Sequence, residues 1–593
     1  MLESQKSIIL NHLNESDHMA KEPFRFYVKK HKRQFFFGIF CLLFTNALDA
    51  LPPLIIGKII DQITDQKPFI DTSLTICLLV GVALAVAIFR YFWRLHWGRY
   101  SHRTAQDVKN KIFSKYLNLG QSFFEKNPVG KLMSLINNDV NAFRMAIGPG
   151  VLILLDALFI SAFVIPLMIY LSPSLTWKTL IFLPLIPFII SKIEALIHDN
   201  YKKQQQQFSE LSATTQEILS GIRTIKSFAQ EDHHETVFND ESKKLENYSN
   251  TVARLEAAFS PILEVGVSTG CVILLFYASP EISSGALTIG ALFSFYQYIQ
   301  TMMWPMAAIG IGLTFWQKGK ASMSRILELL NETTDTPDVG ESDINIFKSL
   351  ELKNLNFNYD GDNKGFSLKN ISLEIKPGEI IGFLGKTGSG KSTITDLISG
   401  IYPTEEGSIL INGQPIQKYK QDSLHDFITY VPQDTFLFSD NIYNNTLLST
   451  DKSNEEVIDT LKTVQLNDEI LNMENQHQTV LGEKGVNISG GQKQRLALAR
   501  GLIRDTKLLI LDDSFSAIDA NTEKQIIEVI NSKLNNLSVI IISHRLASLK
   551  LADKIFVFNE GTIEASGVHE ELLTSSSTYK EVYENQSSNG GTA

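Results

Sequence analysis

Cysteine is scarce in this chain of 593 residues. Cys41, Cys77 and Cys271 are the three cysteines, and each lies within an apolar run of sequence. Three thiols spaced this widely exclude a disulfide framework and a cysteine-based metal site. We therefore expect each cysteine to be a small buried hydrophobic residue.

An excess of positive charge is also lacking. The chain has 54 basic and 64 acidic residues, which gives a net charge of −10. A general nucleic-acid binder is normally strongly basic, so no nucleic-acid partner is expected. The N-terminus has no early apolar core of a secretory signal, and Glu3, Glu15, Asp17 and Glu22 argue against a mitochondrial transit peptide.

The first 320 residues do contain long apolar runs. Six of them reach the ~20 residues that a helix needs to cross a hydrocarbon core of about 30 Å. The runs are 35–60, 73–95, 147–171, 176–197, 258–279 and 286–316. With the polar helical extensions between them, they predict a six-helix transmembrane domain over residues 35–330.

Basic residues are distributed unevenly around these runs. They gather in the two long connections, 97–147 and 198–257, whereas the short connections hold only Lys67. By the positive-inside rule, the long connections and both termini are cytoplasmic. An even number of spans also keeps the C-terminal half in the cytoplasm. We therefore expect a multi-pass protein of the cell (inner) membrane.

Residues 1–34 are expected to form a cytoplasmic leader. Pro23 is followed by aromatic and basic residues up to Arg33, a pattern that predicts a short amphipathic helix on the anionic inner leaflet. A plain solvated leader is the alternative.

Two breaks interrupt the helical pattern of the long cytoplasmic connections. The first is at Pro128 and Gly130, and the second, milder one is at Gly221. Short breaks at the far ends of long helices are natural docking points for a soluble domain.

The composition becomes that of a soluble domain from about Leu350. Strand-like alternation begins there, and Pro-Gly, Asn-Gly and Gly-Gly turns become frequent. These changes predict a linker over 331–349, an α/β domain over 350–585 and a disordered tail over 586–593.

A buried-strand run at 380–384 is followed at once by a glycine-rich loop and a helical run. The loop matches G-x-x-x-x-G-K-[ST] in the strand–loop–helix context that confirms this motif. Its backbone N–H groups surround phosphate oxygens, Lys391 bridges the outer phosphates, and Ser392 offers a hydroxyl to Mg²⁺. The predicted phosphate-binding residues are Gly385, Lys386, Thr387, Gly388, Ser389, Gly390, Lys391, Ser392 and Thr393.

Two further strands end in polar residues. The apolar run 508–511 leads to Asp512 and Asp513, and the run 539–542 leads to Ser543 and His544. In a parallel sheet these ends lie beside the phosphate loop. Asp512 is therefore predicted to hold Mg²⁺, Asp513 to orient or deprotonate the attacking water, and His544 to contact the γ-phosphate.

A second anion-binding sequence precedes another helix. It consists of Ser489, Gly490, Gly491 and Gln492, and a plain helix cap is the alternative reading. One domain does not need two cradles around one γ-phosphate. We therefore expect the second cradle to act on a nucleotide held by another subunit.

With these motifs in this order, the whole chain resembles a half-size ATP-binding-cassette (ABC) exporter of the type IV kind. The resemblance implies an ATP hydrolase coupled to transport. It makes Tyr359 the aromatic that stacks on adenine and Gln433 the residue that links the Mg²⁺ site to the membrane helices. It also implies that two such domains enclose two ATP molecules, and that 516–519 joins the two sites.

One residue departs from the family pattern, since the usual residue after the metal-binding aspartate is glutamate and this chain has Asp513. The side chain is shorter by roughly 1.5 Å, and a misplacement of about 1 Å costs on the order of 10²-fold in rate. This resembles the degenerate-site subunit of heterodimeric bacterial multidrug-type transporters. A second half-transporter subunit is therefore the expected partner, with a homodimer as the alternative.

The predicted spans contain candidate substrate-binding residues. Asp49, Asp156 and Glu264 are acidic, which favours amphipathic cations. Arg90 and Arg94 lie at the cytoplasmic end of the second span, where plain solvation is the alternative to a functional role. The expected substrate is a small hydrophobic compound or a lipid from the bilayer, and an ATP-gated channel or regulatory subunit is the rival function. The sixth span adds residues that suit either a promiscuous cavity or ordinary packing, namely Tyr296, Gln297, Tyr298, Gln300, Met302, Met303 and Trp304.

Overall fold

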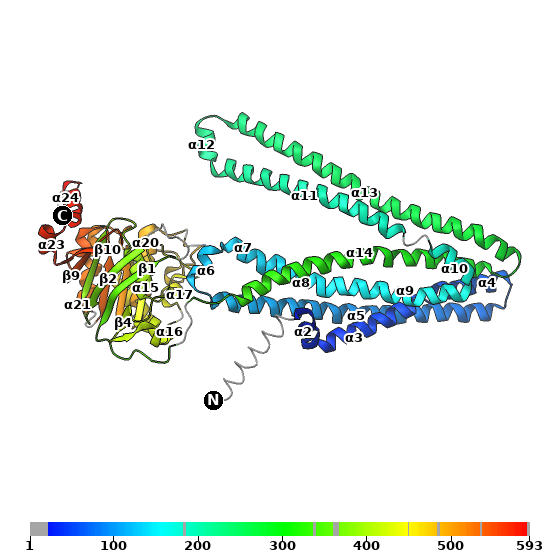
Figure 1. Cartoon of the computed structure of the whole chain (residues 1–593), viewed down its shortest axis with the longest axis horizontal. Helices are drawn as coiled ribbons and strands as arrows, with labels where there is room; N and C mark the ends of the chain where they lie inside the picture. The colour runs from blue at the N-terminus through cyan, green and yellow to red at the C-terminus, as the bar shows by residue number, and fades with distance from the viewer. Residues whose placement is uncertain are drawn as a thin grey trace. The chain divides into compact units, whose positions relative to one another are not determined.

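A computed structural model describes residues 22–181, 185–335, 340–359, 367–448, 450–482, 485, 487–533 and 537–589. The chain divides into two compact units, which are coloured along the sequence in Figure 1. The membrane unit comprises 1–117 and 128–332, and the ATP-domain unit comprises 118–127 and 333–593. A short segment of the N-terminal half, 118–127, therefore belongs to the C-terminal unit.

The membrane unit is entirely helical within the described residues. Prolines begin α2, α4 and α10, where the missing N–H is not needed, and the hydroxyls of Ser172 and Thr288 cap α10 and α14. The helices are α2 Pro23–Lys30, α3 Lys32–Asp49, α4 Pro52–Thr64, α5 Phe69–Leu117, α7 Val129–Ser134, α8 Val140–Met145, α9 Val151–Leu171, α10 Pro173–Leu180, α11 Leu185–Ser220, α12 Ile222–Ser227, α13 Glu231–Ser283 and α14 Ile289–Asn331, with π-helical turns at Leu135–Asp139 and Ala146–Gly150.

Three helical stretches of the described residues are long and apolar enough to cross a membrane. They are Lys32–Thr64, Phe69–Leu117 and Val129–Leu171, and they contain the first three predicted spans. The fourth predicted span falls on α10 and α11, the fifth on α13 and the sixth on α14. Residues 182–184, within the fourth, lie outside the described residues.

Close backbone contact fixes how α4 meets α14. A Cβ added to Gly290 would lie 1.9 Å from the carbonyl oxygen of Gly57, so no larger residue fits there. The hydroxyl of Ser294 donates to the carbonyl of Pro53 at 2.8 Å. Elsewhere α3 packs along α5, α9 along α14, and α11 along α13.

The predicted amphipathic helix of the leader is present as α2, but its aromatic side does not face lipid. Tyr27 is fully buried, and the ring of Phe24 lies 4.2 Å from Trp316 and 5.3 Å from Phe143. These aromatic contacts attach α2 to α8 and α14. The first 21 residues of the predicted leader lie outside the described residues.

The ATP-domain unit contains two sheets. A four-stranded antiparallel sheet has the order β2-β1-β4-β5, and a six-stranded sheet has the order β10-β9-β3-β8-β7-β6. Apart from β10, neighbouring strands of the larger sheet run parallel. The strands are β1 Leu350–Asn358, β2 Ser367–Ile375, β3 Ile380–Gly385, β4 Ile409–Ile411, β5 Gln414–Pro415, β6 Ile428–Val431, β7 Leu508–Asp512, β8 Ser538–Ile542, β9 Lys554–Asn559 and β10 Thr562–Gly567.

Helices accompany these sheets. They are α6 Gln121–Lys126, α15 Lys391–Ile398, α16 Gln421–Phe427, α17 Ile442–Leu447, α18 Asn454–Thr463, α19 Asn467–Leu471, α20 Gly490–Leu502, α21 Ala520–Lys533, α22 Leu546–Leu549, α23 His569–Ser575 and α24 Ser577–Asn589, with short 3₁₀ turns at Ile416–Lys418 and Gln476–Gln478. Every residue of β7 and β8 is buried, as expected for parallel strands covered on both faces.

The prediction of a disordered tail from residue 586 is wrong for 586–589, because α24 continues to Asn589. The side chain of Gln586 explains why. It donates to the carbonyl of His544 at 2.5 Å and accepts from the N–H of Leu546 at 3.0 Å, so the end of α24 is attached to the domain. Residues 590–593 lie outside the described residues.

Candidate active site

The phosphate loop joins β3 to α15, as predicted. Gly388 and Gly390 have φ angles of 81° and 102°, which favour glycine. A Cβ at Gly385 would lie 2.5 Å from the carbonyl oxygen of Phe558, so the first glycine is also required. The buried Lys391 donates from Nζ to the carbonyls of Gly385 at 2.8 Å and Lys386 at 3.0 Å, which holds its ammonium inside the loop.

Asp512 lies at the carboxyl end of β7, one strand away from β3 across β8. The hydroxyl of Tyr430 donates to Asp512 Oδ2 at 3.1 Å. Burial raises the pKa of Asp512, and burial lowers the pKa of Lys391. Burial thus disfavours the charged form of both side chains, and an opposite charge nearby stabilises it. A bound phosphate would do this for the Lys391 ammonium, and a bound cation would do it for the Asp512 carboxylate.

Asp513 and His544 follow adjacent strands. Asp513 has a φ of 46°, and its N–H donates to the carbonyl of Ile542 at 3.0 Å. Gln433 lies beside it, with Nε2 3.5 Å from Asp513 Oδ2. The pKa of His544 is lowered, first by burial and then by Lys391. The structure therefore brings together Gln433, Asp513 and His544 at the carboxyl edge of the parallel strands.

Tyr359 lies beside the phosphate loop. Its hydroxyl is 3.0 Å from Thr393 Oγ1, and its ring meets Tyr402 edge-on at 5.4 Å. The contact with adenine stays a prediction, but Tyr359 is held close to the loop by a hydrogen bond. Tyr402 was not predicted from the sequence, because an isolated tyrosine after a helix carries no motif.

Ser489 begins α20 as a helix cap. Its hydroxyl accepts from the N–H of Gln492 at 3.3 Å, and Gln492 Oε1 accepts from the N–H of Ser489 at 2.9 Å. Gln492 also donates to Glu469 at 2.8 Å. Both Ser489 and Gly490 are exposed, so the helix terminus is accessible to an anion. Its action on a second subunit's nucleotide stays a prediction.

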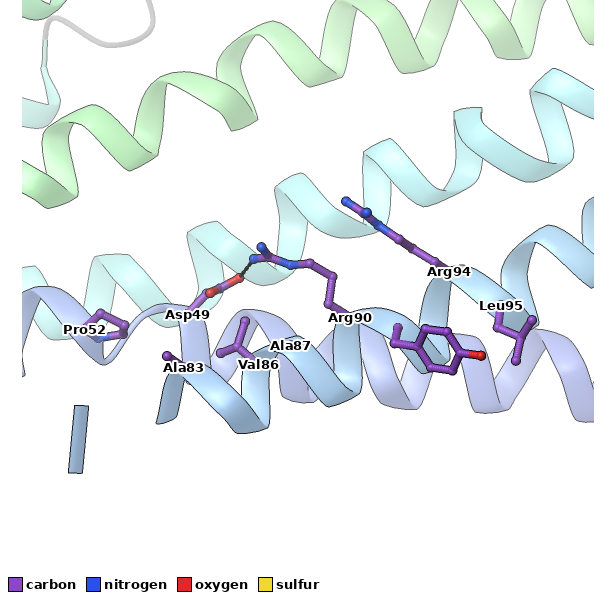
Figure 2. A pocket seen from close by; sticks show the side chains of 9 residues that line it. Asp49, Pro52, Ala83, Val86, Ala87, Arg90, Arg94 and Leu95 are labelled. Atoms are coloured by element: carbon purple, nitrogen blue, oxygen red, sulfur yellow. Dashed lines mark hydrogen bonds and ion pairs between the residues drawn. The ribbon is translucent and has the colours of Figure 1, made fainter. Parts of the chain in front are cut away.

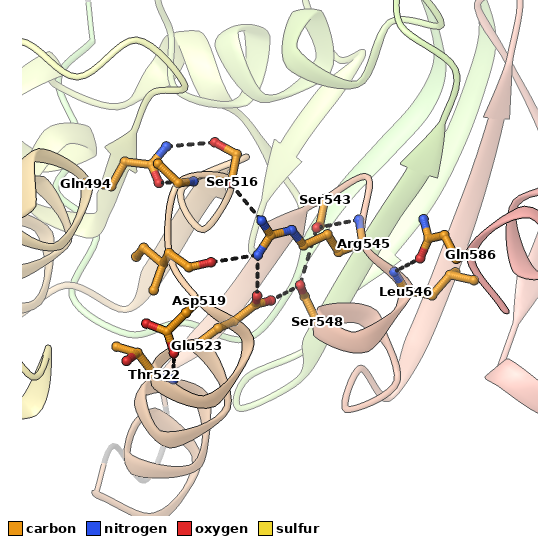
Figure 3. A network of polar contacts seen from close by, with 12 residues as sticks. Gln494, Ser516, Asp519, Thr522, Glu523, Ser543, Arg545, Leu546, Ser548 and Gln586 are labelled. Carbon is orange, nitrogen blue, oxygen red and sulfur yellow. Dashed lines mark hydrogen bonds and ion pairs between the residues drawn. The ribbon is translucent and has the colours of Figure 1, made fainter. Parts of the chain in front are cut away.

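A polar network fixes the loop 516–519 between Gln494 of this helix and Arg545 (Figure 3). Gln494 donates to Ser516 Oγ at 2.7 Å and accepts from the N–H of Ala517 at 2.8 Å. Arg545 donates to the carbonyl of Ser516 at 2.8 Å and pairs with the buried Glu523 at 3.2 Å. Sequence reasoning missed these three side chains, although Arg545 directly follows His544.

The helix α6 is attached to the ATP domain by polar contacts. Its residue Glu125 accepts a hydrogen bond from the hydroxyl of Tyr402. A Cβ at Gly120 would lie 1.8 Å from Asp335 Oδ1, so the chain before α6 passes close to that carboxylate. Because Tyr402 also contacts Tyr359, Glu125 is two side chains away from the phosphate loop.

Oxygen donors suited to Mg²⁺ are present at the loop. Ser392 and Tyr430 hydrogen-bond with the carboxylate of Asp512. Ser389 Oγ is buried and has no hydrogen-bond partner within the described part of the chain. The same ranges contain no cluster of three or more His, Cys, Asp or Glu that could hold a metal by themselves. This set fits Mg²⁺, which takes few protein oxygens and completes its shell with phosphate and water.

Two of the three acidic residues predicted to face a cavity of the membrane unit already have partners. Asp49 pairs with Arg90 at 2.5 Å. Asp156 accepts from Asn46 at 2.9 Å and from Trp304 at 2.8 Å. Glu264 is exposed on α13. An isolated carboxylate for a cationic substrate is thus not found at Asp49 or Asp156.

Some of the candidate substrate-binding residues of the sixth span pack inside the membrane unit. Tyr298 and Met302 are fully buried, and the Tyr298 hydroxyl donates to the carbonyl of Ala50 at 2.7 Å. Tyr296, Gln300 and Trp304 are exposed, and Gln297 and Met303 are half-buried.

Comparison with known proteins covers both units. The model of the ABC transporter transmembrane region matches 35–306, and the ABC transporter model matches 368–516. The multidrug resistance-like ATP-binding protein MdlA of Buchnera aphidicola (subsp. Schizaphis graminum) is 34% identical, over 95% of this chain and 97% of the relative. The chain belongs to the ABC transporter family. Within it, the probable multidrug resistance ABC transporter ATP-binding/permease protein YheI of Bacillus subtilis is 33% identical, over 94% and 96% of the two chains.

Two other ABC transporters widen the comparison. The ATP-dependent lipid A-core flippase of Syntrophus aciditrophicus is 28% identical, over 94% of this chain and 93% of the relative. The solved structure of a bacterial Atm1-family ABC exporter with ATP bound has a TM-score of 0.76 at 23% identity, over 93% of this chain and 99% of that one. The fold is thus a type IV exporter-like six-helix membrane domain fused to an ATP-binding domain. This ABC transporter chain is an ATP-hydrolysing exporter subunit in a membrane, and its ATP-binding domain is cytoplasmic.

Proposed function

We propose that this chain is one half of a heterodimeric exporter and that the ATP held by its own phosphate loop is hydrolysed slowly. The proposed cargo is a hydrophobic or amphipathic compound or a lipid. The proposed location is the inner cell membrane, with both termini in the cytoplasm. Relatives whose names refer to multidrug resistance and to lipid A-core flipping support this range of cargo.

The phosphate loop and the helix cap at Ser489 have separate roles in this proposal. The loop and Lys391 hold the phosphates of ATP, and Tyr359 receives the adenine. Ser489 to Gln492 complete the ATP site of a second subunit, whose corresponding cradle closes on the loop of this chain. Mg²⁺, held by Ser392, Gln433 and Asp512, would neutralise charge on the β- and γ-phosphates.

Asp513 is the observation that carries the heterodimer. The family resemblance assigns this position to a glutamate that orients the attacking water. Asp513 is shorter by one methylene, and its backbone is fixed by the hydrogen bond to Ile542 at 3.0 Å. The carboxylate therefore cannot recover the missing reach by a small backbone shift, and we expect the water to be poorly placed.

Restoring the longer side chain tests this proposal. In the purified complex, Asp513→Glu is expected to raise ATP turnover at this site by about tenfold to hundredfold. Turnover is measured in a single-turnover assay, with Asp513→Asn as the control that keeps the short side chain but removes the base. Unchanged turnover in Asp513→Glu would show that Asp513 does not limit hydrolysis.

Purification from native membranes tests the identity of the partner. A different ABC subunit is expected at a one-to-one ratio with this chain, and mass spectrometry of the complex measures that ratio. If the complex contains two copies of this chain and no other ABC subunit, the heterodimer proposal is wrong and the transporter is a homodimer.

A further inference from the structure

A cavity of about 750 Å³ opens on the membrane unit between the end of α3 and α5 (Figure 2). Four of its lining residues, Ala83, Ala87, Arg90 and Arg94, are spaced by four, three and four positions along α5. This spacing puts them on one face of the helix. The cavity wall is therefore small and apolar at one end and cationic at the other.

The two arginines differ in their partners. Arg90 pairs with Asp49 at 2.5 Å, the contact drawn in Figure 2. Arg94 lines the same cavity, and within the described residues no carboxylate pairs with it; its guanidinium lies 5.5 Å from the ring centre of Trp93. Like charges four residues apart on a helix repel each other. Arg90 is neutralised by Asp49, so Arg94 is the cation that still needs an anion.

Asp156 does not supply that anion. It lies on α9 and is not part of the cavity lining, and both of its oxygens accept hydrogen bonds, one from Asn46 and the other from Trp304. The cavity itself thus presents two guanidinium groups and one carboxylate.

Helix packing sets the depth of these charges. Gly38 of α3 lies against Trp97 of α5, since a Cβ on Gly38 would be 3.1 Å from the Trp97 ring. With a rise of 1.5 Å per residue, Asp49 is ~16 Å and Arg90 ~10 Å further into the bundle. Arg94 lies about one turn closer to the cytoplasmic end than Arg90. An amphiphile entering from the cytoplasmic leaflet would meet Arg94 first.

We propose that this cavity binds an anionic amphiphile, with its phosphate or carboxylate head on Arg94 and Arg90 and its apolar body along Ala83 and Ala87. The planar guanidinium fork binds such heads through two parallel hydrogen bonds. A charge at membrane depth is costly unless an opposite charge pairs with it, and the anionic head group would supply that charge for Arg94. The inference rests on the proposed export function and names its cargo class, in place of amphipathic cations.

Binding by the purified full-length complex in lipid nanodiscs, without nucleotide, tests the inference. The probes are dodecyl phosphate, dodecyltrimethylammonium and inorganic phosphate, titrated by calorimetry. Dodecyl phosphate is expected to bind, and Arg94→Gln is expected to weaken it about tenfold to hundredfold, the range for one lost charge-assisted contact. Arg94→Lys is expected to lose less, because it keeps the charge and loses the fork.

Arg99→Gln is the matched control, because Arg99 lies on the same helix outside the cavity lining. It is expected to bind dodecyl phosphate like the unmodified chain. Equal affinity in Arg94→Gln, tighter binding of the ammonium probe, or equal binding of inorganic phosphate would each overturn the inference. ATP hydrolysis is measured separately. If dodecyl phosphate fails to bind while hydrolysis persists, only the assignment of the cavity is wrong. If hydrolysis is absent while dodecyl phosphate binds, only the export proposal is wrong.

Discussion

The two short helices at the breaks of the cytoplasmic connections differ in what they contact. The first, α6, belongs to the ATP-domain unit, where Glu125 accepts from Tyr402. The second, α12, belongs to the membrane unit, and Ile222 and Phe228 at its two ends are exposed, Phe228 by 72%. One break is thus joined to its own ATP domain by a polar contact, and the other presents apolar side chains to solvent.

This difference indicates two routes for passing a change in the ATP site to the membrane helices. The route through α6 stays within one chain and uses hydrogen bonds. Burial of exposed apolar side chains by a partner is favourable, so we expect α12 to dock on a second subunit. A fitting acceptor is the counterpart of the groove of about 470 Å³ in this ATP-domain unit, which is lined by Phe436, Phe438 and Arg500.

Placing a charge at the end of α12 gives the largest expected effect. Phe228→Asp removes an apolar contact that is worth about 1.5–3 kcal/mol when buried. We expect association of the two subunits to weaken by about tenfold to hundredfold, measured by sedimentation of the purified complex. Ser227→Asp is the matched control, since it adds the same charge to a neighbouring exposed residue. Unchanged association in Phe228→Asp would show that α12 does not dock on the partner.

The breaks themselves were predictable from the sequence, but their contacts were not. Pro128 and Gly221 interrupt any helical pattern, and the structure ends one helix and begins another at each of them. The contacts that join the first break to the same chain include the pair Glu125 and Tyr402, which are separated by 277 residues. No local pattern records such a pair.

The active site shows the same division. The phosphate loop and Asp512 were predictable, because β3 and β7 are buried runs that end in a glycine-rich loop and a carboxylate. Tyr430 and Arg545 act through hydrogen bonds to groups distant in sequence, and such residues carry no motif. In the membrane unit, the charge of Asp49 predicted a site for a cation, but the structure pairs this carboxylate with Arg90.

Asp396 provides a test that responds to α6 and not to α12. Its pKa is raised to about 6, mainly by burial, with Asp512 and Glu125 raising it further and a hydrogen bond from Tyr430 opposing them. Because the folded-state pKa lies above the unfolded value of 3.8, the stability due to the neutral acid is complete below about pH 4 and is lost as the pH rises through 6. Allowing for partial exposure, the loss is about 2 kcal/mol.

Thermal unfolding of the full chain between pH 4 and 8 measures this effect. The difference in melting temperature between Asp396→Asn and the unmodified chain is expected to grow as the pH rises through 6, in favour of the variant. Glu125→Gln is expected to shift that transition to lower pH, whereas Phe228→Asp leaves it in place. A pH-independent difference would show that Asp396 is ionised throughout.

The smallest effect is expected from weakening the direct contact between α6 and the ATP domain. Tyr402→Phe removes the hydrogen bond and Glu125→Gln removes its charge, so the double variant is expected to lose no more than the larger single loss. The coupling free energy in this double-mutant cycle should be about 1 kcal/mol, because Glu125 is exposed and partly solvated. The quantity to measure is the ratio of transported cargo to hydrolysed ATP. Loss of a contact that transmits closure lowers this ratio, whereas loss of a contact that only packs lowers the melting temperature. Additive losses would show that Glu125 and Tyr402 act independently, so that their contact is not the element through which α6 transmits closure.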